Sequence, residues 1–83
     1  MPGRGKTQAD RDLQAVIGNR LGIAADREYG EFSRTAQAEI LGIPLATWLE
    51  TRNGHRLPSL ARLVHYASLL GVTVAWLCGE EPE

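Results

Sequence analysis

The chain has 83 residues, 43% of them hydrophobic and 23% charged, which suits one small folded domain and excludes a two-domain enzyme or a disordered chain. Its single cysteine, Cys78, excludes an internal disulfide, and we find no signal-peptide pattern or apolar run of about 20 residues, so we expect a cytoplasmic protein without a membrane segment. The formal net charge of −1 gives no overall support for nucleic-acid binding.

The charges are unevenly distributed along the chain. Residues 33–66 contain four arginines and two glutamates, whereas the acidic C-terminal tail, residues 80–83, contains three glutamates. A basic middle beside an acidic end indicates that one face of the domain is suited to an anionic partner.

The N-terminal part of the chain divides into an arm and a helix. Residues 1–7 contain two glycines and a proline and have no apolar periodicity, which predicts a flexible basic arm. From there, apolar residues recur at helical spacing and predict a first helix over residues 8–27. Gly18 and Gly22 weaken the propensity of this segment for the helical state.

Two short helices are expected next, around a glycine. After a loop, Ser33 is a favourable N-cap for a second helix over residues 34–41, which Gly42 ends. Pro44 fits the first position of a third helix, which runs to about Arg52.

The C-terminal third of the chain predicts two more helices. Pro58 marks the start of a fourth helix that ends at Gly71, and Thr73 caps a short fifth helix that Gly79 closes. The fourth helix is expected to bury one apolar stripe, formed by Leu60, Leu63, Val64, Ala67 and Leu70. The pattern therefore predicts an all-α domain of five helices over residues 8–79.

The two helices that flank Gly42 are the most informative feature of the sequence. Ala38 lies four residues before this glycine, where two helix backbones have to approach closely. Trp48 lies six residues after it and places a large apolar group on the core side of the third helix. This spacing is typical of two helices that cross at a steep angle, as in the helix-turn-helix of DNA-binding proteins, although an ordinary pair of helices without a nucleic-acid role has it too.

Four fragments of the chain resemble one family of proteins. Residues 17–21 are similar to the opening of its first helix, and residues 38–43 to the end of its second helix and the turn. Residues 53–60 resemble its loop after the recognition helix, and residues 69–77 its closing helix. In this order and at these separations, they resemble the phage-repressor (Cro and C-repressor type, or XRE) helix-turn-helix family.

This resemblance implies a compact five-helix, lambda-repressor-like domain of phage or prophage origin that acts as a transcriptional repressor or regulator. It implies a homodimer on a pseudo-palindromic operator in double-stranded DNA, with the third helix in the major groove. The residues that would read bases are Pro44, Leu45, Ala46, Thr47 and Glu50.

The resemblance also implies contacts with the DNA backbone. Arg34 stands at the start of the second helix, and the loop after the third helix offers main-chain N–H groups and Arg56. The residues expected to contact phosphate are Arg34, Asn53, Gly54, His55, Arg56, Arg4 and Lys6. Because we see no separate dimerisation segment, the last helix and the tail are expected to form the dimer interface, through Val74, Trp76, Leu77 and Cys78.

Three features of the sequence depart from the family pattern. The third helix begins with apolar residues in place of a polar cluster, so we expect few hydrogen bonds between its side chains and base edges. The usual ion pair between the first and third helices is replaced by Ala25 and Arg52, and we expect Arg52 to pair instead with Asp26 or Glu28. Gln37 occupies a commonly apolar position, so the second helix is expected to be less deeply packed.

Two other hypotheses about the function stay open. Leu45 and Leu49 form an apolar pair on the outward face of the third helix, which also suits an adaptor or antitoxin that binds a protein partner there. A domain that binds DNA well only within a larger repressor complex is a further option.

We expect no catalytic site, cofactor or metal, because His55 and His65 are isolated and Cys78 has no second thiol nearby.

Overall fold

The computed structural model describes residues 7–82, which form five helices and no strand. The helices are α1 (Gln8–Tyr29), α2 (Arg34–Leu41), α3 (Leu45–Arg52), α4 (Leu60–Leu70) and α5 (Val74–Leu77). The predicted all-α fold of five helices is confirmed. None of the described helices is long and apolar enough to cross a bilayer.

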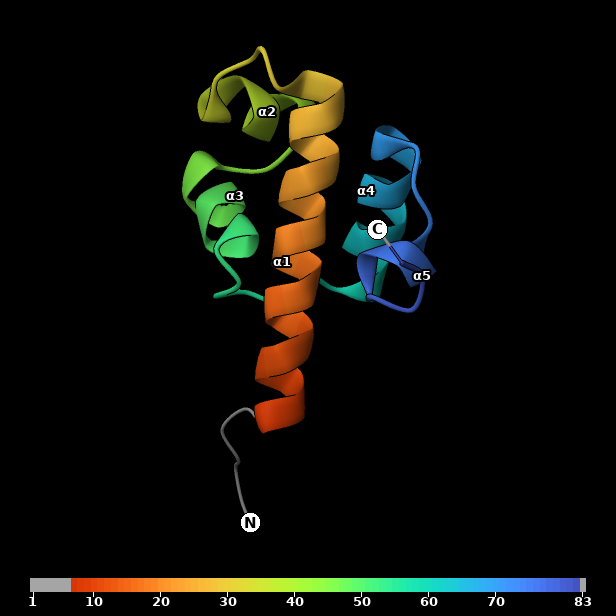
Figure 1. The fold of residues 1–83 in the computed structure, drawn as a ribbon. Coiled ribbons are helices and arrows are strands. Elements are labelled where there is room, and N and C mark those ends of the chain that lie inside the picture. Colours follow the sequence, from red (N-terminus) through yellow and green to blue (C-terminus); the bar gives the residue numbers. More distant parts are fainter. Residues whose placement is uncertain (1–6, 83) are drawn as a thin grey trace.

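The long helix α1 runs through the middle of the domain (Figure 1). The pair α2 and α3 lies on one side of it, and α4 and α5 lie on the other. Helix α1 packs against α3, α4 and α5, so it joins the two halves. Their shared core consists of Ile17, Leu21, Ala24, Ala25, Ala38, Leu41, Ile43, Trp48, Leu63, Tyr66, Ala67, Leu70 and Leu77.

Helix α1 begins at Gln8, as predicted, but the residue before it was assigned to the wrong segment. Thr7 belongs to the helix cap and not to the arm, because its hydroxyl accepts from the backbone N of Asp10 at 3.1 Å. The Asp10 carboxylate accepts in return from the backbone N of Thr7 at 3.2 Å, which completes a capping box. At its other end, α1 continues two residues beyond the predicted limit, to Tyr29. The rest of the predicted arm, with Arg4 and Lys6, lies outside the described residues.

Helices α3 and α4 each begin one or two residues later than predicted. Pro44 has an extended backbone, with ψ of 150°, and is the N-cap of α3 instead of its first helical residue. In α4 the cap is Ser59, whose hydroxyl accepts from the backbone N of Arg62 at 3.2 Å. This bond fixes the start of α4 at Leu60, so Pro58 lies outside the helix.

The predicted apolar stripe of α4 is partly wrong. Leu60 and Val64 are 70% and 54% exposed, whereas Tyr66 is 2% exposed and faces the core. The buried stripe runs through Leu63, Tyr66, Ala67 and Leu70, at the spacing of three and four residues that one helix face requires. Tyr66 therefore belongs to the buried stripe, and Val64, which was predicted to belong to it, does not.

The turn between α2 and α3 has the predicted geometry. Gly42 has φ of 77°, a left-handed conformation that glycine adopts without steric cost. The backbone N of Ile43 donates to the Ala38 carbonyl at 3.0 Å, which closes the end of α2. Ala38 and Trp48 are both buried, so the tight turn brings α2 and α3 together around them, as expected.

A second glycine sets the distance between α1 and the end of α3. A Cβ atom on Gly18 would collide with the carbonyl oxygen of Thr51 and would lie 2.9 Å from the backbone N of Gly54. Both obstacles are backbone atoms and cannot move aside like a flexible side chain. Gly18 therefore permits the close packing of α1 against the end of α3, which offsets its unfavourable helix propensity.

Candidate nucleic-acid interface

One buried polar side chain, that of Gln37, helps to fix the position of α3. Gln37 of α2 is 1% exposed, so the prediction of loose packing there is wrong. Its Oε1 accepts from Nε1 of Trp48 at 3.1 Å, and its Nε2 donates to the Tyr29 carbonyl at 3.0 Å. The amide satisfies groups on α1 and α3 at once, which is why a polar residue is tolerated at this position.

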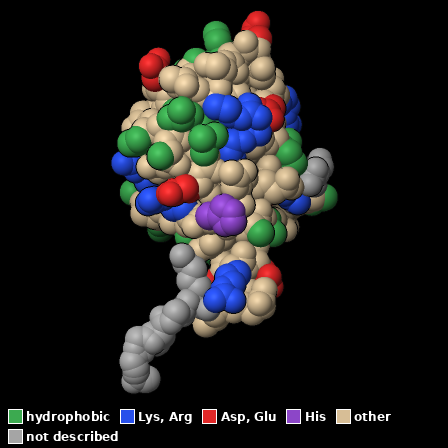
Figure 2. All heavy atoms as spheres, turned by 90° about the vertical axis from the view of Figure 1, so that its left-hand side faces the viewer, with side chains coloured by type: hydrophobic (Ala, Val, Ile, Leu, Met, Phe, Trp, Pro, Cys, Tyr) green, Lys and Arg blue, Asp and Glu red, His purple; other side chains and the backbone are tan. Residues whose placement is uncertain are grey.

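The outer face of α3 carries the predicted base-reading residues. Pro44, Leu45, Ala46 and Glu50 are exposed, and Thr47 is half-buried. Leu49 is 37% exposed, as is Leu45, so the two leucines form the expected apolar pair at the surface. Hydrophobic and basic side chains are found close together on this side of the molecule (Figure 2).

One carboxylate on α1 joins two arginines. Oδ2 of Asp26 lies 2.9 Å from Nη2 of Arg52, and Oδ1 lies 3.3 Å from Nη1 of Arg34. Of the two carboxylates predicted for Arg52, Asp26 and Glu28, the structure pairs it with Asp26, and Arg52 also lies over the Trp48 ring. The hydrogen bond from Arg52 is the main cause that holds the pKa of Asp26 below its usual value of 3.8.

The ion pairs of Asp26 predict that the free energy of unfolding depends on pH. Since the folded pKa of Asp26 is lowered, its stabilising contribution is present above pH 3.8 and is lost as the pH falls through the folded value. Urea unfolding followed from pH 7 down to pH 2 should therefore show a steeper loss of stability in the wild type than in Asp26→Asn. Parallel curves for the two proteins would contradict the assignment.

Glu50 and Arg56 form a surface ion pair. Oε1 of Glu50 lies 2.8 Å from Nη2 and 3.0 Å from Nε of Arg56. The sequence assigned one of them to base reading and the other to phosphate contact, and did not predict that they bind each other. Both side chains are about half exposed, so an incoming anion could displace the carboxylate.

The backbone of the loop after α3 is less available than predicted. The N–H groups of Asn53, Gly54 and His55 donate to the carbonyls at the end of α3, at 3.0, 3.1 and 2.9 Å. The Gly54 carbonyl accepts from Nε2 of Gln14 at 3.0 Å. The expectation of main-chain donors for phosphate is therefore wrong at these three residues, because closing α3 uses them. The residues His55 and Arg56 are exposed, so their side chains remain available to a partner.

The predicted dimer surface is only partly at the surface. Leu77 is fully buried in the core of its own domain, so it cannot contact a second copy in this fold. Val74, Trp76 and Cys78 are half-buried. The Trp76 ring lies 4.9 Å from the guanidinium of Arg20 and 5.5 Å from that of Arg27, which places two positive charges at this surface.

The acidic tail is packed onto the domain as far as it is described. The backbone N of Glu80 donates to the Ala75 carbonyl at 2.9 Å, and the carboxylate of Glu81 accepts from the hydroxyl of Thr73 at 3.2 Å. Arg20 donates to the carbonyls of Trp76 and Glu81. The tail thus continues the α5 side of the domain, opposite α2 and α3.

Sequence reasoning missed three residues that shape this region, Gln14, Arg62 and Tyr66, and misjudged a fourth, Gln37. Gln14 and Gln37 are buried polar side chains, whereas Arg62 and Tyr66 line a cavity beside α3. Only their positions in the fold reveal these roles. Among the described residues, no group of three or more His, Cys, Asp or Glu side chains could hold a metal ion.

Comparisons with family models, with curated proteins and with solved structures found no match for this chain. The functional argument therefore depends on the geometry described above.

Proposed function

We propose that this protein binds duplex DNA through α3 and regulates transcription as a small helix-turn-helix repressor. The observation that carries the proposal is the exposed outer face of α3, held by the buried Trp48 on its inner side and by the tight turn at Gly42. A single helix fits the major groove of B-DNA, and a rigid one presents its side chains in a fixed register.

The surroundings of α3 suit a polyanion. Arg34 on α2 and Arg56 in the loop after α3 are both exposed and can contact phosphates. Each is paired with a carboxylate, so DNA has to replace Asp26 at Arg34 and Glu50 at Arg56. Because these are surface pairs, the replacement costs little.

Base reading by α3 would come from few groups. Leu45 and Ala46 can contact thymine methyl groups, and Glu50 can accept from cytosine N4 once Arg56 has turned to a phosphate. We include a homodimer in the proposal, with Val74, Trp76 and Cys78 as the accessible part of its interface. Two copies would then read two half-sites of an operator.

A second candidate is a helix-turn-helix adaptor or antitoxin that binds a protein partner. It is favoured by the exposure of both Leu45 and Leu49, 37% each, on the same face of α3. Such an apolar pair is suited to a protein surface as well as to thymine methyl groups.

Selection of bound duplexes from a random pool, followed by fluorescence anisotropy across a salt series, tests the proposal. An enriched palindrome that binds at least about a hundredfold more tightly than a scrambled duplex is the expected result. Failure to enrich any sequence, with affinity in the non-specific range, would favour the protein-binding alternative.

Variants of the ion pair at the end of α3 should act in opposite directions. Arg56→Ala should weaken binding to all sequences and reduce the salt slope by about one unit. Glu50→Ala should strengthen non-specific binding, because it leaves Arg56 free for phosphate, and should change the preferred sequence. Anisotropy with the selected and the scrambled duplex measures both effects.

The matched control is Arg27→Ala. It removes one positive charge from the α5 side of the domain, where Arg27 lies against Trp76. Because Trp76 belongs to the proposed dimer interface, light scattering first checks that the variant keeps the oligomeric state of the wild type. Duplex affinity should then change less than in Arg56→Ala. Equal losses in both variants would show that only net charge matters and would refute the assigned interface.

A further inference from the structure

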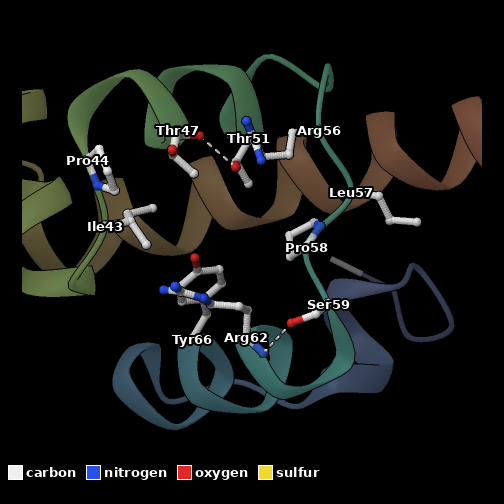
Figure 3. A pocket seen from close by; sticks show the side chains of 10 residues that line it. All are labelled: Ile43, Pro44, Thr47, Thr51, Arg56, Leu57, Pro58, Ser59, Arg62 and Tyr66. Atoms are coloured by element: carbon white, nitrogen blue, oxygen red, sulfur yellow. Dashed lines mark hydrogen bonds between the residues drawn. The ribbon is translucent and has the colours of Figure 1, made fainter.

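A cavity of about 300 Å³ opens between the start of α3, the following loop and α4 (Figure 3). It lies next to the proposed DNA-reading face, because Pro44 and Thr47 belong to both. The lining residues include two arginines and no carboxylate. They are Ile43, Pro44, Thr47, Thr51, Arg56, Leu57, Pro58, Ser59, Arg62 and Tyr66.

The hydroxyl of Tyr66 is the unusual group in this cavity. The residue is 2% exposed, and its hydroxyl points into the cavity, where its oxygen can accept a hydrogen bond from the guanidinium of Arg62 (Figure 3). Burial raises the pKa of Tyr66 above its usual value of 10.0, against the opposing effects of Arg62 and Arg56, so the group is a protonated donor at neutral pH. Because the hydroxyl oxygen accepts from an arginine, the hydroxyl proton stays available for an anionic ligand.

Positive charge approaches the cavity from two elements. Arg56 lines it from the loop and Arg62 from the first turn of α4. The start of this helix adds its partial positive charge, since the first backbone N–H groups of a helix have no intrahelical acceptor. Glu50 binds Arg56 but is not among the residues that line the cavity, so it competes with an anion for one arginine only.

We propose that this cavity binds one phosphate group, with the exposed guanidinium groups of Arg56 and Arg62 and the buried Tyr66 hydroxyl as donors. The apolar walls formed by Ile43, Leu57 and Pro58 suit the carbon atoms next to the phosphate in an ester. The phosphate can come from the backbone of duplex DNA or from a free phosphate compound. The first source rests on the proposed function, and the second does not.

Titration of the full-length protein with inorganic phosphate, followed by NMR at constant ionic strength, tests the site without DNA. We expect saturable shifts at Arg62 and Tyr66, and a loss of affinity of about tenfold in Arg62→Gln, as for a lost charge-assisted hydrogen bond. Glu50→Gln should bind phosphate more tightly, and Arg27→Gln, on the α5 side, should bind it like the wild type. Shifts that do not saturate, or equal affinity in Arg62→Gln, overturn the proposal.

Tyr66→Phe separates binding from folding. Because the partner of the hydroxyl is the exposed side chain of Arg62, which water can solvate in its place, removal of the hydroxyl should change the midpoint of urea unfolding little, while phosphate affinity falls. Unchanged phosphate affinity would overturn the assigned role of the hydroxyl. The role would also be overturned if the variant is less stable and its smaller folded fraction alone accounts for the weaker phosphate binding.

Duplex binding by the same variants identifies the source of the phosphate. Weaker duplex binding by Arg62→Gln and Tyr66→Phe, together with stronger competition from phosphate than from chloride at equal ionic strength, assigns the cavity to the DNA backbone. Saturable phosphate binding with unchanged duplex affinity in the variants assigns it to a free phosphate compound. If the wild type binds phosphate but no duplex, this site stands and the proposed function fails; if it binds duplex but no phosphate, the reverse holds.

Discussion

Replacing Gly18 by alanine should lower the free energy of unfolding by about 2 kcal/mol or more, since overpacking commonly costs about 1–3 kcal/mol. The new Cβ would collide with the carbonyl of Thr51 and crowd the backbone N of Gly54, so α1 and the end of α3 would have to separate. The intrinsic helix preference of alanine over glycine, about 1 kcal/mol, acts in the opposite direction and is expected to be outweighed. Urea unfolding followed by circular dichroism measures the difference.

Gly22→Ala is the matched control on the same helix. Its Cβ would meet only the guanidinium of Arg52, at 3.3 Å, and this end of a flexible side chain can move. Stability should therefore stay within about 1 kcal/mol of the wild type, because the gain in helix propensity offsets a weaker contact with Asp26. Equal losses in the two variants would rule out the close approach at Gly18 as the cause.

The helices and the turn were predictable because their signals are local. Ser33 and Thr73 act as N-caps where they were expected, and Gly42 adopts the left-handed conformation that ends α2. Such signals involve residues within three or four positions of one another, so the sequence contains both partners. The same local reasoning fails where two neighbouring residues both signal a helix start, as Pro58 and Ser59 do before α4.

The packing was predicted less well because it depends on contacts between distant segments. Periodicity gave the core side of α4 only approximately, since Val64 and Tyr66 are both plausible core residues and the position of α1 decides between them. Gln37 was misjudged for the same reason. A glutamine can be buried only if acceptors and donors surround it, and here they come from Tyr29 and Trp48 in other helices.

The candidate site was predictable in its location but not in its pairings. The exposed face of α3 and the pair of Arg52 with Asp26 follow from the sequence, because a half-buried guanidinium needs a nearby carboxylate. The contact between Glu50 and Arg56 depends on the path of the loop after α3, which Gln14 and Gly18 help to define. The cavity at Tyr66 depends on the same loop, and no local pattern indicates it.

Gln37→Leu should lower the free energy of unfolding by about 3 kcal/mol, because it leaves the buried Nε1 of Trp48 without an acceptor and removes two further hydrogen bonds. Leucine has a similar volume, so the loss would come from unsatisfied polar groups and not from a cavity. Urea unfolding followed by tryptophan fluorescence measures it.

Gln14→Leu is the comparison that isolates this cause. Gln14 is also buried, 5% exposed, but its Oε1 has no hydrogen-bond partner and its Nε2 makes one bond, to the Gly54 carbonyl. Removing an unsatisfied atom together with a single bond should cost about 1 kcal/mol or less. Equal destabilisation by Gln14→Leu and Gln37→Leu would show that the loss of any buried amide lowers the free energy of unfolding by this amount. The hydrogen bonds that join α1 to Trp48 through Gln37 would then not determine where α3 lies.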